Sequence, residues 1–347
     1  MRRMIALICT VLALVLAAGC RRSRSVPQTV PPAPATSVTV YVALDRPYSE
    51  PILNAFARAR GIRVNPVYDL EANKTTGLTN RLIAEKDNPQ CDVFWNNEIA
   101  RTLVLKSKGL LEPYVSPSAS DIPERFKDPE GYWCGFAARA RVLVYNTDLV
   151  KESDLPKSIM DLLKPAWKGR IAMGNPMFGT TATDAAALFA VLGEAGAKDY
   201  FRRLKANDVK VLPGNAAVRD MVAQGEYALG FTDTDDVWSG IRGGKPIAMI
   251  CPDQEGRGTL LIPNTVALIR GAPHPESAKA LVDYLLSREA EAQLAACGSR
   301  QIPVRADVPR PEGVPGISEI KSVDVSYEGV AAEMERSQAF LEDLFLR

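Results

Sequence analysis

The chain has 347 residues, with 42 Lys and Arg against 41 Asp and Glu, so its formal net charge at pH 7 is +1. It has no basic stripe with interleaved aromatic residues, and this composition argues against nucleic acid as a partner. The single histidine, His274, excludes a His-rich metal site, and its position in a turn before an expected helix predicts a surface residue.

The first twenty residues read as an export signal and not as part of the fold. Arg2 and Arg3 give a basic start, and the apolar run 4–18 is too short for a comfortable membrane span. The run ends in LAAGC, small residues that lead into Cys20. This pattern resembles the lipobox of bacterial lipoproteins, in which the signal is cut before a cysteine that carries lipid. The alternative is an ordinary cleaved secretory signal, and with either signal we expect export to the cell envelope, on its periplasmic face.

Residues 21–37 are rich in Pro, Ser and Arg and contain almost no large apolar side chain. Such a segment cannot bury enough surface to order itself, so we expect a disordered tether between the lipid anchor and the folded body. No later apolar run is long enough to span a bilayer, and we therefore expect membrane contact through the anchor only.

The cysteine spacing argues against a zinc or redox motif, because no C-x-x-C pattern occurs. An exported compartment permits disulfides. Three pairings remain open for the four cysteines of the body, which are Cys91, Cys134, Cys251 and Cys297.

Hydrophobic periodicity predicts alternating strands and helices from residue 38 onward. The first helix has Ser49 as a plausible N-cap and Gly61 as its stop. We expect strands at 38–44, 62–69 and 91–95 and helices at 48–61, 75–88 and 99–109. This order is typical of a parallel sheet with crossover helices.

The same theme restarts after two extended segments in tandem at 132–148. Strands are expected at 169–173, 209–213, 226–231 and 246–250, and helices at 180–196, 197–207 and 216–225. An extended run at 260–269 then crosses back, and helices at 275–287, 288–297 and 326–347 complete the chain.

The element order predicts two α/β units, with the second inserted into the first and two extended segments crossing between them. Such a fold is a two-lobed clamshell. We assign residues 38–138 and 262–347 to lobe I and residues 139–261 to lobe II. A chain of this kind closes by hinge motion around a ligand between its lobes.

Polar residues follow four of the expected strands, where ligands bind in open α/β sheets. They are Asn97 and Glu98 after 91–95, Gly179, Thr180 and Thr181 after 169–173, Asn215 after 209–213, and Asp233, Asp235 and Asp236 after 226–231. The alternative is capping, since Asn215 is a good N-cap and Asp235 and Asp236 suit the N-cap and first turn of a short helix. Capping and ligand binding are compatible.

Charge adds a further argument for a ligand. Three neighbouring carboxylates repel one another unless a positive group lies between them or water surrounds them. Side chains alternate between the two faces of an extended segment, so Arg139 and Arg141, two residues apart, lie on the same face. A guanidinium there suits the bidentate binding of an anion. The alternative is a pair of solvent-facing arginines on a hinge strand.

At these residues the chain resembles the bacterial ferric-iron-binding proteins of ABC importers, within the extracellular solute-binding proteins of periplasmic-binding-protein type II fold. The resemblance covers nearly the whole chain after the tether and is carried by VTVY, DVFWNNE, ARARVLVYNT, PAWKGRIAM, GNAAVRDMVAQGE and IPNTVALIRGAPHPESAKALVDYLLS. It implies a monomer without required cofactors that captures a small ligand and delivers it to the transmembrane subunits of a permease.

Carried over by position, the resemblance implies a ferric ion with a synergistic anion. The anion would lie on Gly179, Thr180 and Thr181 with help from Asn215. The metal ligands would fall at Asp45, at Asn97 or Glu98, and at Asp235 and Asp236, where iron-binding members carry a tyrosine pair.

The missing tyrosines leave two ligand classes open. Carboxylates still suit a hard, oxygen-loving cation, so ferric iron with a small anion is the first expectation. They suit equally the ammonium of an organic zwitterion, such as an aminophosphonate or another phosphorylated solute, with its acid group on Gly179–Thr181.

An enzyme is the rival class, because acids near threonines suit a metal-assisted hydrolase or a glycosidase pair. The sequence contains no histidine base at these junctions, no nucleophile elbow and no P-loop. A purely structural envelope lipoprotein would not explain the polar strand ends. We therefore expect a binding protein and not an enzyme.

Overall fold

The structure, a computed structural model, describes residues 36–69 and 75–347. The predicted signal, the lipidation site Cys20 and most of the tether lie outside these residues. Thr36–Arg347 forms one unit by its internal contacts. Within the described ranges, no helix combines the length and the apolar character that a membrane span requires.

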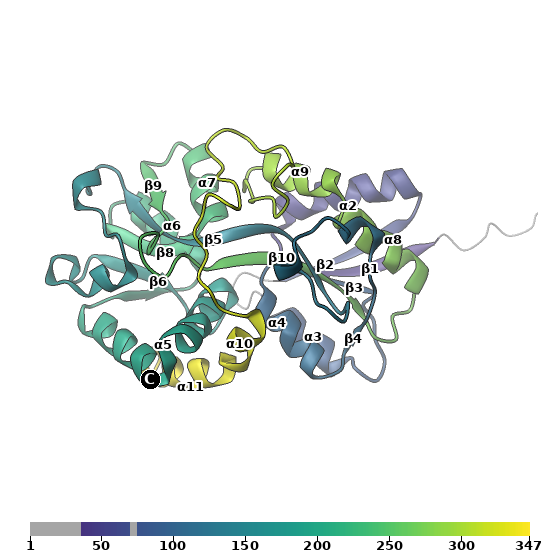
Figure 1. Ribbon diagram of the computed structural model, residues 1–347, viewed down its shortest axis with the longest axis horizontal. Coiled ribbons are helices and arrows are strands. Elements are labelled where there is room, and N and C mark those ends of the chain that lie inside the picture. Colours follow the sequence, from purple (N-terminus) through teal and green to yellow (C-terminus); the bar gives the residue numbers. More distant parts are fainter. Residues whose placement is uncertain (1–35, 70–74) are drawn as a thin grey trace, which may run out of the picture. The chain divides into compact units, whose positions relative to one another are not determined.

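The described strands form one ten-stranded sheet (Figure 1). Its order is β2-β1-β3-β10-β5-β8-β6-β7, while β4 pairs with β10 and β9 pairs with β5. The strands are β1 (Ser37–Val42), β2 (Arg63–Tyr68), β3 (Val93–Asn96), β4 (Leu111–Glu112), β5 (Cys134–Asn146), β6 (Ile171–Gly174), β7 (Lys210–Leu212), β8 (Leu229–Asp233), β9 (Ile247–Ile250) and β10 (Leu261–Ile269).

Strand β5 joins two parts of this sheet. Its first part pairs antiparallel with β10 as far as Ala140, and its second part pairs with β8 and β9 from Arg141 onward. We call β1–β4, β10 and the first part of β5 the first half, and β6–β9 with the rest of β5 the second half. The predicted α/β architecture with two crossings is confirmed. The two extended segments expected at 132–148 are a single buried strand of 13 residues.

The helices are α2 (Arg46–Arg60), α3 (Thr76–Ala84), α4 (Ile99–Ser107), α5 (Gly179–Ala206), α6 (Asn215–Ala223), α7 (Thr234–Arg242), α8 (Pro275–Leu285), α9 (Arg288–Ala296), α10 (Tyr327–Ala332) and α11 (Met334–Phe345). Short 3₁₀ turns lie at Pro117–Ala119, Glu124–Phe126, Glu152–Asp154, Ile159–Leu163 and Pro165–Trp167.

Helix α2 begins before Ser49, so the predicted N-cap is wrong. The N-cap is Asp45, and Pro47 in the first turn favours the earlier start because its fixed φ suits a helix N-terminus. Ser49 is buried, and its hydroxyl donates to the carbonyl of Leu44. Gly61 ends the helix with a positive φ of 65°, as predicted.

Two further helix boundaries differ from the prediction. The two helices expected at 180–196 and 197–207 are both present within α5, but the break between them lies at Gly193, where φ is 71° and ψ is 162°, and the second ends at Ala206. The single C-terminal helix expected at 326–347 is divided into α10 and α11. Helix α10 contacts both α4 and α5, and α11 packs against α5.

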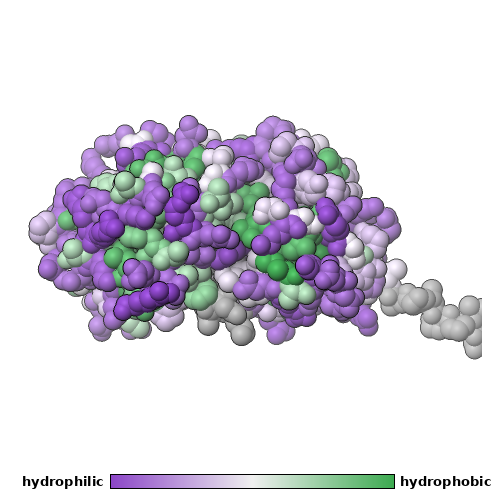
Figure 2. All heavy atoms as spheres, turned by 90° about the horizontal axis from the view of Figure 1, so that it is seen from below, coloured by the Kyte–Doolittle hydropathy of each residue, from purple (hydrophilic) through white to green (hydrophobic). Residues whose placement is uncertain are grey.

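The apolar core continues from one half into the other. One cluster includes Val40 and Trp95 of the first half, Val142 of β5 and Val222 of the second half. A second cluster unites Phe189 of α5 with Leu341 of α11, which explains why the end of the chain lies on the second half. Figure 2 shows a mostly hydrophilic face with smaller hydrophobic areas.

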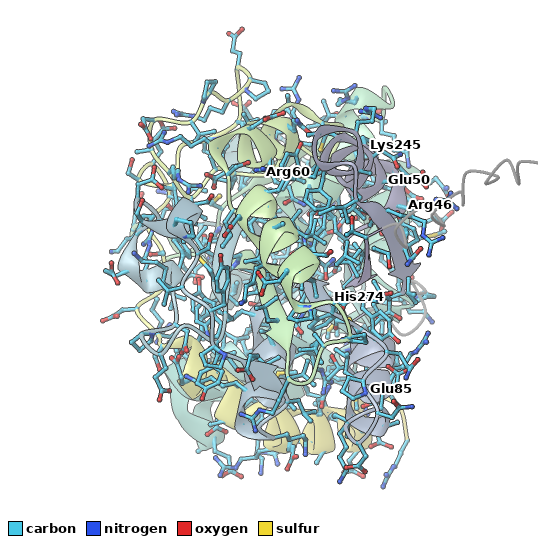
Figure 3. All side chains as sticks on the ribbon, turned by 90° about the vertical axis from the view of Figure 1, so that its right-hand side faces the viewer. Arg46, Glu50, Arg60, Glu85, Lys245 and His274 are labelled. Atoms are coloured by element: carbon cyan, nitrogen blue, oxygen red, sulfur yellow. The ribbon has the colours of Figure 1, made fainter. Side chains whose placement is uncertain are left out.

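Surface groups follow ordinary helix chemistry. Arg46 and Glu50 lie one turn apart on α2 and form an exposed ion pair of 2.8 Å (Figure 3). His274 is exposed, as predicted, and its Nδ1 lies 3.0 Å from Oδ2 of Asp92.

The four cysteines of the body, Cys91, Cys134, Cys251 and Cys297, are free thiols in this structure, and Cys91 and Cys134 are buried.

Candidate functional site

A small polar cavity lies beside β5 and takes residues from both halves. Its volume is about 40 Å³, room for about three water molecules. The first half contributes Asp45 and Asn97, and β5 contributes Arg139. The second half contributes Asn175, Phe178, Gly179, Thr180, Thr181, Pro213, Gly214, Asn215, Asp233, Asp235 and Asp236. The structure thus brings together every predicted binding residue except Glu98.

Asp233 is a structural hub. It ends β8 and is fully buried. Nη1 of Arg141 donates to its Oδ1 at 2.8 Å, and its Oδ2 accepts from the Thr180 hydroxyl at 2.5 Å and from the Asn215 amide at 2.9 Å. Both oxygens are therefore hydrogen-bonded within the chain, and they join β8 to β5, α5 and α6.

Asp235 and Asp236 lie in the first turn of α7, where the helix dipole favours acids. The N-cap position belongs to Asp233 and not to either of them. Asp236 accepts a hydrogen bond of 3.1 Å from the Thr232 hydroxyl. One oxygen from each of Asp233, Asp235 and Asp236 lies within 4.8 Å of the others, a spacing that could hold a cation.

The two arginines share one face of β5, as predicted, but both are buried, with 4% of each side chain exposed. The solvent-facing alternative is therefore wrong. Nη1 of Arg139 lies 3.2 Å from Asp235 and 3.8 Å from Asp233, while Nε of Arg141 lies 3.4 Å from Asp184. The chain's own guanidiniums thus supply positive charge among the acids.

Burial and charge act in opposite directions on these arginines. Burial alone would lower the pKa of Arg139, but the carboxylates of Asp235 and Asp233 outweigh burial, and the pKa is raised. The same balance, with Asp233 and Asp184 as the acids, raises the pKa of Arg141. Both side chains are therefore held as cations.

The start of α5 forms the opposite wall. Gly179 is its first residue and has a positive φ of 55°. The hydroxyls of Thr180 and Thr181 donate to Asp233 and Asn215, so they are engaged within the chain. The backbone N–H groups of a first helical turn have no intrahelical partner and remain suited to an anion. Gly174 permits this close packing, since a Cβ there would lie 2.7 Å from the Thr181 hydroxyl.

Glu98 and Asn97 have different roles. Glu98 is buried as the N-cap of α4, where its carboxylate accepts from the backbone N–H groups of Ala100 and Arg101 and from the Thr183 hydroxyl at 2.7 Å. We predicted a metal ligand here, but these bonds hold its oxygens away from the cavity. Asn97 lines the cavity instead, and its buried Oδ1 accepts no hydrogen bond from the described residues.

Gly214, which the sequence places beside Asn215 at the same junction, also lines the cavity. Sequence reasoning missed Asn175, Phe178, Pro213 and Asp184. The first three belong to the same strand-end junctions as the predicted residues, so the junctions themselves were the available signal. Asp184 lies four residues after Thr180 on α5, and this helical spacing could have placed it beside Arg141.

Comparison with known proteins identifies relatives along most of the chain. Iron uptake protein A1 from Synechocystis sp. is 27% identical over 323 residues, which cover 90% of this chain and 88% of that protein. A putative 2-aminoethylphosphonate-binding periplasmic protein from Salmonella typhimurium is 28% identical over 285 residues, or 80% of this chain and 78% of that protein. Iron-bound HitA from Pseudomonas aeruginosa has a similar fold, with a TM-score of 0.80 at 23% identity over 89% of this chain and 99% of that one.

The sequence profile of one family matches residues 101–320, which include both arginines, the start of α5 and the acidic cluster. That range is more than half of the chain. The protein therefore belongs to the bacterial extracellular solute-binding proteins.

Proposed function

We propose that the protein captures a small charged solute in the cavity beside β5 and delivers it to the permease of an ABC importer. One observation carries this proposal: Asp235 and Asp236 face the same cavity as the start of α5. Carboxylates attract a positive group and a helix N-terminus attracts a negative one. The best-matched ligand therefore carries both charges, either as two bound species or in one molecule.

Ferric iron with a small anion is the first candidate. Carboxylate and amide oxygens are suitable ligands for a hard cation. Asp235 and Asp236 from the second half, with Asp45 and Asn97 from the first, are the groups that would hold it. Relatives whose names refer to iron support this choice.

An organic zwitterion with an ammonium and a phosphonate or phosphate group is the second candidate. The described lining contains no tyrosine, so the phenolate oxygens that favour ferric iron are absent from it. The relative named for 2-aminoethylphosphonate supports this candidate. Its ammonium would lie on the acids and its phosphonate on the first turn of α5.

Other parts of the proposal rest on the sequence. We retain a lipid anchor at Cys20, a tether, a monomeric body and the absence of catalysis. We keep the two lobes with two revisions. The boundary moves from 138/139 to 140/141 and from 261/262 to 260/261, because Arg139 and Ala140 pair with Ile262 and Leu261 of β10, and α11 is reassigned to lobe II, because it packs against α5.

Native mass spectrometry with metal analysis of the same purified sample tests the ligand. Iron bound at one equivalent together with a small anion supports the first candidate. An added organic mass without metal supports the second. A purified protein that binds neither ferric ion with bicarbonate nor 2-aminoethylphosphonate would contradict both.

A further inference from the structure

The two arginines of β5 are held in different ways, although they lie two residues apart on one face. Nη1 of Arg141 donates to Asp233 at 2.8 Å and to the oxygens of Thr180 and Asn215 at 3.3 Å each. Its guanidinium is thus fixed by hydrogen bonds to β8, α5 and α6. Arg141 is part of the framework of the second half.

Arg139 is held mainly by charge. Its Nη1 approaches Asp235 at 3.2 Å and Asp233 at 3.8 Å, whereas a charge-assisted hydrogen bond is ordinarily about 2.7–2.9 Å long. Nε and Nη2 of Arg139 are buried and donate to no acceptor among the described residues, and the same is true of Arg141, whose Nη1 nevertheless makes the three hydrogen bonds given above. Because buried donors without acceptors are costly, this position of the guanidinium is not its best hydrogen-bonded state.

The location of Arg139 adds a second argument. Its backbone pairs with Ile262 of β10, in the first half, while Asp233 and Asp235 belong to the second half. A ligand cation on Asp235 and Asp236 would use the same oxygens and lie within a few ångströms of the guanidinium. Like charges at that distance in a buried site repel strongly.

We propose that Arg139 is an internal counter-cation of the acidic cluster, which a ligand cation displaces and which then pairs with the ligand's anion. This inference rests on the proposed function. The exchange conserves charge, because the acids keep a cation and the guanidinium keeps an anion. It also gives the donors Nε and Nη2 an acceptor. Arg139 is thus the residue that couples the two parts of the ligand.

Coupling of this kind is measurable and reciprocal. The anion should raise the affinity for the cation, and the cation should raise the affinity for the anion by the same factor. Typical couplings lie between about 5-fold and about 150-fold. Without the guanidinium, the cation no longer competes with an internal charge, and the anion loses its partner.

Calorimetry with Tb³⁺, a trivalent oxygen-seeking ion, in chloride alone and with added sulfate tests the inference. For the unmodified protein we expect sulfate to tighten Tb³⁺ binding at least about fivefold, the lower end of such couplings. Arg139→Gln should bind Tb³⁺ in chloride at least as tightly as the unmodified protein, and sulfate should have no effect. Arg139→Lys, which keeps the charge, should restore competition in chloride.

Arg219→Gln is the matched control. Arg219 lies near Asp236 and forms an ion pair with Asp220, so the variant removes a second positive charge near the acidic cluster and leaves Arg139 in place. We expect its sulfate coupling to equal that of the unmodified protein. Weaker Tb³⁺ binding by Arg139→Gln, or a sulfate effect that survives in it, would overturn the inference.

A parallel titration with 2-aminoethylphosphonate separates this inference from the proposed function. This molecule carries both charges, so Arg139→Gln should bind it at least about tenfold more weakly, while Arg219→Gln should bind it normally. If the unmodified protein binds a probe and Arg139→Gln binds it identically, only the role of Arg139 is wrong. If the unmodified protein binds neither ferric ion with bicarbonate nor 2-aminoethylphosphonate, the proposed function fails and this inference with it.

Discussion

Asp233 and Asp236 lie three residues apart but differ in burial and in hydrogen bonding. Asp233 accepts bonds from Arg141, Thr180 and Asn215 and has no exposed surface, whereas Asp236 is partly exposed in the cavity. The same carboxylate chemistry therefore joins elements of the fold at Asp233 and forms a partly exposed part of the cavity lining at Asp236. Substitution should separate these roles.

Asp233→Asn should destabilise the ligand-free protein. The change removes the charge that compensates the buried guanidinium of Arg141, and breaking a buried ion pair from one side costs about 3–5 kcal/mol. Urea unfolding of the variant and the unmodified protein measures the difference. If the free energy of unfolding changed by less than about 1 kcal/mol, the size of an ordinary hydrogen bond, Asp233 would not be needed to hold these elements together.

Asp236→Asn should weaken cation binding without loss of stability. Asn keeps an oxygen that can accept from Thr232, while the lost charge relieves repulsion within the acidic cluster. We expect affinity for Tb³⁺ to fall at least tenfold, about 1.4 kcal/mol, with the melting temperature of the ligand-free protein equal or higher. Normal binding combined with a lower melting temperature would show that Asp236 is structural.

At this scale the sequence predicts the cluster but not its counter-charges. Three acids after a strand indicate a need for positive charge, and that need is evident from residues 233–236 alone. The group that meets it at Asp233 is Arg141, 92 residues earlier in the chain. The register of β5 against β8 places Arg141 opposite Asp233, and long-range register is not encoded in any local pattern.

At the scale of elements, polar strand ends both cap helices and line the cavity. Glu98 illustrates the first role, because its carboxylate caps α4 and also accepts from Thr183 of α5. The sequence predicted the junction correctly, since strand ends and helix starts are local signals. It could not distinguish Asn97, which lines the cavity, from Glu98, which does not, because adjacent side chains point in different directions.

The burial of Glu98 should appear as a pH dependence of stability. Burial raises its pKa above the ordinary 4.5, despite the opposing hydrogen bonds from Thr183 and Arg101. The folded chain then binds the proton more tightly than the unfolded chain. The contribution of Glu98 to the free energy of unfolding is therefore greatest below pH 4.5 and falls as pH rises through the folded-state pKa.

Glu98→Gln removes this titration. We expect the free energy of unfolding of the unmodified protein, minus that of the variant, to decrease between about pH 4 and about pH 8. Glu276→Gln is the control, because Glu276 lies in the first turn of α8 with 85% of its side chain exposed. This variant shows the effect of replacing a carboxylate that is not buried. A pH-independent difference for Glu98→Gln would contradict the raised pKa.

Backbone features explain why the bounds of β5 and the start of α2 differ from the prediction. Periodicity predicted extended structure at 132–148, but strand continuity across two sheet partners depends on β8 and β10, which come much later in the chain. The start of α2 was misplaced because Ser49 is a good N-cap residue by type, while Pro47 favours an earlier start.

At the scale of the whole molecule, the cavity combines Asp45 and Asn97 of the first half with the acids and helix start of the second. A ligand that contacts both halves stabilises the arrangement in which they are close. Alternation of strands and helices along the sequence was enough to predict two α/β halves and two crossings. It was not enough to place α11, whose packing on α5 depends on side chains such as Leu341.

Ligand binding should compact and stabilise the protein. We expect saturation with ferric ion and bicarbonate, or with 2-aminoethylphosphonate, to lower the radius of gyration and raise the melting temperature, because the ligand binds only the closed native form. Small-angle scattering and calorimetry measure the two quantities. Asp236→Asn at the same ligand concentration should show smaller changes. An unchanged scattering profile at confirmed saturation would contradict closure.

The described chain starts beside β1 in the first half and ends after α11 on the second half. Thr36 and Arg347 are both exposed and neither lines the cavity. A pair of fluorescent dyes at these positions would convert any rotation of one half against the other into a change in energy transfer. Helix α10 contacts both α4 of the first half and α5 of the second, so such a rotation would change its contacts with one of them. The ends of the body are thus natural attachment points for an optical sensor of its solute.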